Sequence, residues 1–174
     1  MRIKFLLVLF LIGFILQFGN AQLSVKYEKF SLPNGLTVIL HEDHTLPVAT
    51  CNIWYHVGSG REKPGRTGFA HLFEHLMFMG SGHVPVGKFD EWLEAAGGDN
   101  NGSTTSDRTN YWENFPTSAL ELALFLESDR LGYLVDVMTP EKVDAQRDIV
   151  KNERRQSYEN RPYGMSSIVI GENL

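Results

Sequence analysis

Short apolar runs separated by turn residues fill much of this chain and predict β-strands. Residues 27–32 and 36–41 flank Pro33-Asn34-Gly35, whose Asn-Gly pair between two such runs predicts a hairpin. Residues 48–57 alternate between apolar and polar positions, which predicts a third strand. Two further strands are expected over residues 101–105 and 109–115, which are rich in threonine and aromatic residues.

Helices are predicted between and after these strands. One occupies residues 89–96 and is stopped by Gly97-Gly98. Thr117 or Ser118 is expected to cap another, which carries leucines at positions 120, 124 and 131. Thr139-Pro140 opens the last one, with an N-cap residue followed by proline at the first helical position.

Composition and charge restrict the class of protein. A chain of 174 residues with 43% hydrophobic residues suits one globular domain with a substantial core. The formal net charge of −5 gives no electrostatic reason to expect a nucleic-acid partner. Cys51 is the single cysteine, so an internal disulfide is excluded, and its apolar neighbours predict a small buried residue rather than a reactive thiol.

The N-terminal segment has the organisation of a secretory signal peptide. Arg2 and Lys4 precede an uninterrupted apolar run over residues 5–16, and Gly19-Asn20-Ala21 supplies small residues at the cleavage positions. That run is short for a bilayer span, so cleavage is expected rather than a stable membrane anchor. We therefore predict that residues 1–21 are removed and that residues 22–174 are exported, to the periplasm or as a secreted protein.

The stretch His71-Leu72-Phe73-Glu74-His75 carries the candidate chemistry. Residues four apart share a helix face, so His71 and His75 can direct two imidazoles at one cation, with Glu74 beside it. The order H-x-x-E-H is that of inverzincin metallopeptidases, and these groups are the minimum for zinc hydrolysis. A solvated polar face without chemistry is the alternative. Apolar neighbours on nearly every side favour the metal, because such a helix is normally buried and buried ionisable groups need partners.

A third ligand is predicted on the last helix. Val143, Gln146, Val150 and Glu153 fall on one stripe at spacings of three and four residues, so Glu153 points with the apolar side chains. A carboxylate there is costly unless it meets a cation or a donor, and zinc held by two histidines needs a third protein ligand. Glu153 is the best-placed residue, and an internal salt bridge with an arginine is the alternative. The basic residues at positions 151, 154 and 155 fall on other faces and are expected in solvent.

Several ordered blocks of the sequence resemble the pitrilysin and mitochondrial-processing-peptidase family of zinc metallopeptidases. These blocks are residues 58–60, 68–78, 97–111 and 147–153. The resemblance implies an α+β fold, with a mixed, largely antiparallel sheet covered by helices. It also implies an endopeptidase for unfolded peptides or oligopeptides, with Zn²⁺ held by His71, His75 and Glu153 and with Glu74 as general base.

The resemblance assigns residues around the metal as well. Asn101 and Gly102 match positions on an edge strand that binds the peptide substrate as an added strand, although an ordinary turn is the local alternative. Gln146 stands seven residues before Glu153, where family members often carry a glutamate behind the ligands. An amide there can hydrogen-bond but adds no negative charge, so metal affinity is expected to be altered.

Members of the resembled family are much longer and use two related halves, in one chain or two, that close into a chamber. The resemblance therefore implies a metallopeptidase half that is incomplete at its C-terminus, a second homologous half as partner, and oxyanion donors contributed by that half. Two other functions compete. One is a non-catalytic peptide-binding or scaffold subunit, which the presence of all four site residues disfavours. The other is a zinc hydrolase for small molecules, which the five-residue motif alone does not exclude.

Overall fold

The computed structural model describes residues 24–173. The chain divides into two compact units after Leu46, and each unit has its own sheet. The predicted signal peptide over residues 1–21 lies outside the described residues. Within the part that the structure covers, no helix combines the length and the hydropathy needed to span a membrane.

The first unit contains a β-hairpin. Strands β1 (Glu28–Ser31) and β2 (Thr37–Leu40) pair antiparallel. Between them, Gly35 adopts φ +88° and donates its N–H to the carbonyl of Leu32 at 2.9 Å. Glycine accepts this left-handed conformation without steric cost. The hairpin predicted around Pro33-Asn34-Gly35 is confirmed.

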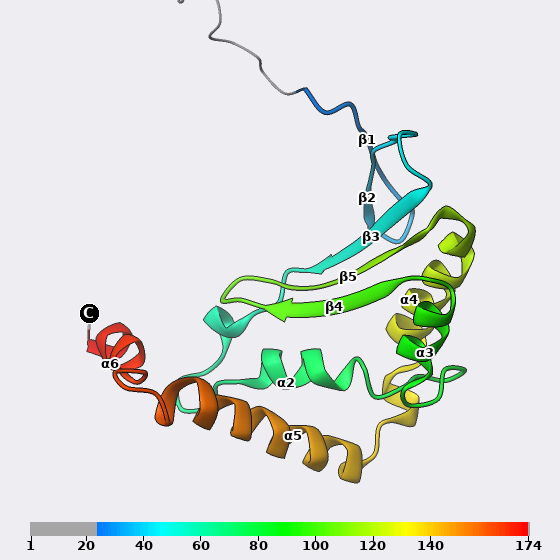
Figure 1. Cartoon of the computed structure of the whole chain (residues 1–174). Helices are drawn as coiled ribbons and strands as arrows, with labels where there is room; N and C mark the ends of the chain where they lie inside the picture. The colour runs from blue at the N-terminus through cyan, green and yellow to red at the C-terminus, as the bar shows by residue number, and fades with distance from the viewer. Residues whose placement is uncertain (1–23, 174) are drawn as a thin grey trace, which may run out of the picture. The chain divides into compact units, whose positions relative to one another are not determined.

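The second unit is built on a three-stranded sheet in the order β3-β5-β4 (Figure 1). Its strands are β3 (Val48–Tyr55), β4 (Asp99–Thr104) and β5 (Thr109–Pro116), close to the predicted ranges. Both neighbours of β5 run antiparallel to it. The described strands pair antiparallel throughout, in agreement with the expected largely antiparallel sheet. β4 is an edge strand of the described sheet.

Helices α2 (Phe69–Leu76), α3 (Lys88–Ala95) and α4 (Leu120–Tyr133) lie against the same face of this sheet, and α5 (Pro140–Arg154) runs beside α2 (Figure 1). The chain continues through a π-helical turn, η5 (Arg155–Glu159), into α6 (Ser166–Asn173). Short 3₁₀ turns complete the elements: η2 (Ser59–Arg61), η3 (Thr117–Ala119) and η4 (Val135–Val137). The predicted start of α5 is confirmed, because the Thr139 hydroxyl accepts the N–H of Lys142 and Pro140 is the first helical residue.

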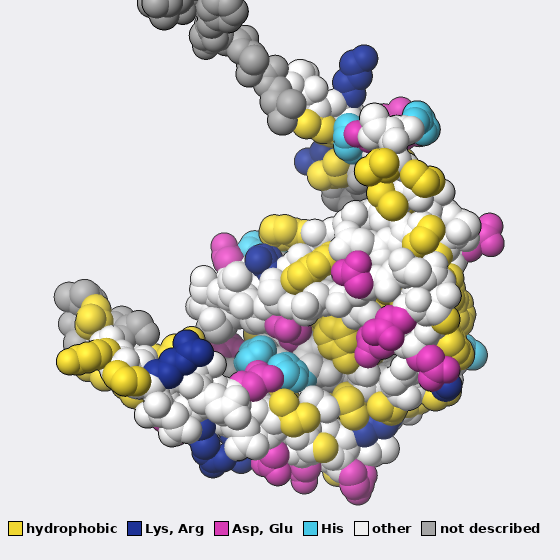
Figure 2. All heavy atoms as spheres, viewed as in Figure 1, with side chains coloured by type: hydrophobic (Ala, Val, Ile, Leu, Met, Phe, Trp, Pro, Cys, Tyr) yellow, Lys and Arg dark blue, Asp and Glu magenta, His cyan; other side chains and the backbone are white. Residues whose placement is uncertain are grey.

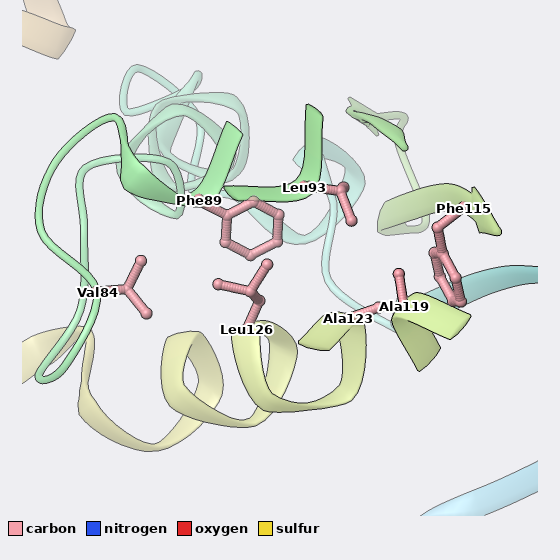
Figure 3. Packing of buried hydrophobic residues seen from close by; sticks show 7 residues of the cluster. All are labelled: Val84, Phe89, Leu93, Phe115, Ala119, Ala123 and Leu126. Atoms are coloured by element: carbon pink, nitrogen blue, oxygen red, sulfur yellow. The ribbon is translucent and has the colours of Figure 1, made fainter. Parts of the chain in front are cut away.

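The main core lies where α3 and α4 meet the sheet. Seven buried residues form it, as Figure 3 shows: Val84, Phe89, Leu93, Phe115, Ala119, Ala123 and Leu126. Cys51 packs against this cluster from β3, and burial raises the pKa of its thiol to about 12. This environment matches the expectation of a small apolar residue rather than a reactive thiol.

The expected cap of α4 is wrong, although the helix carries the predicted leucines. Thr117 and Ser118 form a 3₁₀ turn instead of a cap, and the N-cap position is occupied by Ala119 without a side-chain hydrogen bond. The leucines at positions 120, 124 and 131 are exposed. The buried residues of α4 are Ala123, Leu126, Glu127, Asp129 and Arg130. Two of the charged ones, Glu127 and Arg130, form an internal ion cluster with Glu113 on β5.

Arg130 is the centre of this internal ion cluster. Its Nη2 donates to Oε1 of Glu127 and, at 3.2 Å, to Oε1 of Glu113 on β5. All three side chains are at most 2% exposed. The guanidinium also lies 4.5 Å from the ring centre of Phe89 and 4.4 Å from that of Tyr111, in cation–π geometry.

Two carboxyl groups facing one guanidinium leave an uncompensated negative charge if both ionise. Burial raises the pKa of Glu113 to about 9, reinforced by the hydrogen bond and the charge of Glu127. Near neutral pH Glu113 therefore holds a proton, which removes the excess charge from the interior.

Candidate metal centre

A carboxylate from the preceding loop fixes the beginning of α2. Gly68 occupies the N-cap position with φ +99° and offers no side chain to cap the helix. Glu62 takes that role, because its two carboxylate oxygens accept the N–H groups of Gly68 at 2.6 Å and Ala70 at 2.7 Å. The first N–H groups of a helix lack intrahelical partners, and a negative charge there is favourable. No sequence pattern marks Glu62, which stands seven residues before the first residue of the helix.

His71 and His75 stand on successive turns of α2. Their Nε2 atoms lie 3.2 Å apart, so both rings present the same nitrogen to one point. The helix is less enclosed than its composition predicts. Ala70 and Leu76 are buried, whereas Phe69 and Phe73 are 61% and 52% exposed. An apolar composition on nearly every side of α2 therefore does not mean that every side is buried.

Glu153 reaches the two imidazoles from α5. Its Oε2 lies 3.5 Å from Nε2 of His71 and 3.4 Å from Nε2 of His75. The structure thus brings together the three residues that the sequence singles out as ligands. Among the described residues no arginine lies within ion-pair distance of Glu153, so the alternative of an internal salt bridge finds no support.

The spacing of these three atoms fits a tetrahedral metal ion. Ligand atoms about 2.0–2.1 Å from a zinc ion at tetrahedral angles lie about 3.4 Å from one another. The three separations here are 3.2, 3.4 and 3.5 Å. Two imidazole nitrogens and one carboxylate oxygen are also the donor set that Zn²⁺ accepts in catalytic sites, with one position left for water or substrate. The residues present fit the ion.

The cluster opens onto a cleft of about 1030 Å³ between α2, the β4 edge and α5. His71, Glu74 and Glu153 all line it. Figure 2 shows histidine and acidic side chains gathered in a hollow of this face. Half-exposed basic residues of α5 also line the cleft: Arg147, Lys151 and Arg154. Lys151 and Arg154 are exposed to solvent, as expected. Their position in the wall of the cleft is not part of that expectation.

Glu74 contacts the edge strand. Its Oε2 accepts a hydrogen bond from the Thr104 hydroxyl on β4. A side-chain carbon at Gly102 would lie 3.3 Å from Cγ and 3.4 Å from Oε1 of Glu74, so a glycine there leaves room for the carboxylate. No sequence motif marks Thr104.

Asn101 and Gly102 lie within β4, so the alternative of an ordinary turn is wrong. The Asn101 side chain is exposed, and its Oδ1 accepts the N–H of Gly102 at 2.8 Å. Gln146, by contrast, is not directed at the cluster. Its amide nitrogen donates to Sδ of Met79 at 2.9 Å, and within the described residues no hydrogen bond joins it to either histidine or to Glu153.

The sequence model of the insulinase family, peptidase family M16, matches residues 37–169, which is most of the chain. The chain belongs to this family. Among M16 relatives, it is 34% identical to the zinc protease PqqE of Helicobacter pylori over 144 residues, covering 80% of this chain and 31% of that protein. It is 30% identical to the insulin-degrading enzyme homolog of Dictyostelium discoideum, covering 83% of this chain and 15% of that protein.

Solved structures agree with this M16 assignment. The crystal structure of a protease from H. pylori superposes with a TM-score of 0.77 at 32% identity, covering 81% of this chain and 34% of that one. Pitrilysin superposes with a TM-score of 0.68 at 26% identity, covering 78% of this chain and 14% of that one. The predicted α+β fold and the resemblance to the pitrilysin family are confirmed. The chain spans about a third or less of the length of these M16 proteins.

Proposed function

We propose that this chain is the zinc-binding half of a metalloendopeptidase. The observation that carries the proposal is the triangle of His71, His75 and Glu153, whose ligand atoms lie 3.2–3.5 Å apart beside a carboxylate on the same cleft. The relatives support it, since the H. pylori protein is named a zinc protease. A purely structural role would leave two imidazoles and a carboxylate converging without a cation.

In this proposal Glu74 does the proton chemistry. Bound Zn²⁺ supplies Lewis acidity that activates water and polarises the scissile carbonyl. Glu74 lines the cleft and accepts the proton of the attacking water, then delivers it to the leaving amine. His71, His75 and Glu153 hold the ion, and α2 keeps the base within one turn of both histidines.

The edge strand β4 is the proposed peptide site. An extended peptide can pair with an open strand edge and so present its backbone along the cleft. Asn101 and Gly102 lie on β4, and Gly102 also lines the cleft. The N–H of Gly102 donates to Oδ1 of Asn101. A peptide that pairs at this point would offer its own backbone carbonyl as the acceptor in place of the Asn101 side chain.

A second homologous half is the proposed partner, within one longer polypeptide or as a separate subunit. The chain covers 31% of the H. pylori zinc protease, so a protein of that length is long enough to contain a second half of similar size. That half would supply the donors that stabilise the oxyanion. The 174-residue chain by itself is expected to bind zinc weakly and to hydrolyse little.

Export is the proposed location, to the periplasm or the medium. It rests on the basic start, the apolar run over residues 5–16 and the small residues before position 22. N-terminal sequencing of the protein from fractionated cells tests it. A mature terminus near residue 22 is expected, and an exported protein that keeps residues 1–21 contradicts it.

The decisive experiment is the Glu74→Gln variant of the full-length gene product, compared with wild type for zinc content and for cleavage of unfolded peptides. The amide keeps the shape of the side chain but cannot accept the water proton, so zinc content stays while turnover is lost. Full activity of the variant would show that Glu74 is not the base. Ester and amide small molecules in the same assay separate a peptidase from a general zinc hydrolase, and a wild-type protein without turnover would favour a scaffold subunit.

A further inference from the structure

The carboxylate of Glu74 is gripped at one of its two oxygens. Oε2 accepts the hydroxyl proton of Thr104, whereas Oε1 lies beside Gly102. Gly102 and Thr104 are two residues apart on β4, so they present the same face of the strand to α2. Gly102 has no side chain next to the carboxylate, and Thr104 supplies one hydrogen-bond donor to it.

Thr104 is itself held in place by the neighbouring strand. Its Oγ1 lies 3.1 Å from the hydroxyl oxygen of Thr109 on β5, and the Thr109 hydroxyl donates to the carbonyl of Val57 at 2.9 Å. A hydroxyl carries one proton. Because Thr109 commits its proton to Val57, only its lone pairs face Thr104.

The Thr104 proton therefore has two acceptors, the neutral oxygen of Thr109 and the carboxylate of Glu74. A hydrogen bond to an ionised acceptor is about twice as strong as one between neutral groups, so the proton points at Glu74. Glutamate has three side-chain torsions, and without an anchor its carboxylate samples several rotamers. One charge-assisted bond from a rigid strand restricts it to the rotamer seen here.

We propose that Thr104 is a positioning residue for the reaction, which holds Oε2 of Glu74 so that Oε1 is the oxygen left to receive the water proton. This role rests on the proposed function, since it has meaning only if Glu74 is the base. Thr104 need not touch the metal or the substrate. Its contribution is to keep the base in reactive geometry, where small displacements are costly.

The test compares Thr104→Val with Thr104→Ser in the full-length protein. Valine keeps the branched shape and removes the hydroxyl, and serine restores the donor. We expect Thr104→Val to lower kcat by about 10- to 100-fold with KM and zinc content unchanged. Thr104→Ser should stay within about threefold of wild type. The matched control is Thr50→Val, which deletes a hydroxyl that donates to Asn114 at 2.8 Å in the same sheet and should leave kcat unchanged.

A double-mutant cycle separates positioning from support of the fold. If Thr104 acts through Glu74, adding Thr104→Val to Glu74→Gln does not lower the residual turnover of Glu74→Gln any further, measured at high enzyme concentration. Unchanged kcat in Thr104→Val, an equal loss in Thr104→Ser, or a full additional loss in the double variant each overturns the proposal. Should Thr104→Val fold poorly, the serine variant and the cycle with Thr104→Ala give the same decision. Failure of the proposed function is distinguishable, because there Glu74→Gln itself retains activity.

Discussion

Two groups of ionisable side chains in the second unit are built in opposite ways. The cluster of His71, His75 and Glu153 is open, with side chains 42%, 20% and 42% exposed on a cleft. The internal ion cluster of Arg130, Glu113 and Glu127 is closed, with no side chain more than 2% exposed. The open cluster brings two imidazole nitrogens and a carboxylate oxygen within 3.5 Å of one another and contains no arginine or lysine, whereas the closed one supplies its own cation. Ionisable groups that converge on an open cleft are candidates for binding a ligand. Buried charged groups that neutralise one another belong to the folded interior.

The largest expected effect comes from breaking the open cluster. Glu153→Ala removes a ligand atom 3.5 Å from one imidazole nitrogen and 3.4 Å from the other. The full-length variant should lose zinc and, with it, turnover by several orders of magnitude, while its metal-free form unfolds at the wild-type temperature. Metal analysis and thermal unfolding after chelation check both parts. The control is Glu159→Ala, a carboxylate of the same segment that pairs with Arg154. Normal zinc content in Glu153→Ala would remove Glu153 from the ligand set.

Breaking the closed cluster should give the reverse pattern. Arg130→Met leaves two buried carboxyl groups without their cation, so we expect a loss of about 3–5 kcal/mol in the free energy of unfolding. The proposed zinc ligands lie elsewhere, and variant protein that remains folded should still bind zinc. Arg147→Met is the control, because its half-exposed pair with Asp144 at 2.8 Å should contribute only about 0–1 kcal/mol. Equal losses in the two variants, measured by urea unfolding, would contradict the distinction.

The smallest effect concerns the proton in the closed cluster. Burial raises the pKa of Glu113 from its ordinary 4.5 to about 9, so between these values the folded protein keeps a proton that the unfolded chain releases. Because the folded-state pKa is raised, this contribution to stability is fully present below pH 4.5 and is lost as the pH rises towards 9. Glu113→Gln should flatten the decline in urea midpoint between pH 6 and 8. If the variant declines as steeply as wild type, the proton is not on Glu113.

The sequence predicts the open cluster better than the closed one, for a physical reason. His71 and His75 are four residues apart on one helix, and Glu153 follows from the stripe on α5, so local periodicity places all three. The same reasoning fails for α4. The spacing of its residues does not show that Glu127 and Arg130 are buried, because their partner Glu113 lies on β5, in another segment of the chain.

Contacts between distant segments account for the other misses. Thr104 meets Glu74 across 30 residues, and nothing in the spacing of either marks the pair. Gln146 lies on the predicted stripe of α5, but its amide nitrogen donates a hydrogen bond to the sulfur of Met79 instead of facing the cluster. The sequence predicts the strands to within a few residues, because turn residues delimit them. Their order around β5 depends on tertiary contacts that the local pattern does not show.

The carboxylate of Glu62 has a consequence for transplanting this chemistry. α2 has eight residues, about two turns, and a helix that short does not persist by itself in water. Its first turn is tied down by an anchor in the preceding loop, so a graft of the five-letter motif onto a foreign scaffold would leave the imidazole pair on a fraying end. The smallest segment to transfer is residues 62–76, which includes both the helix and the loop that carries Glu62.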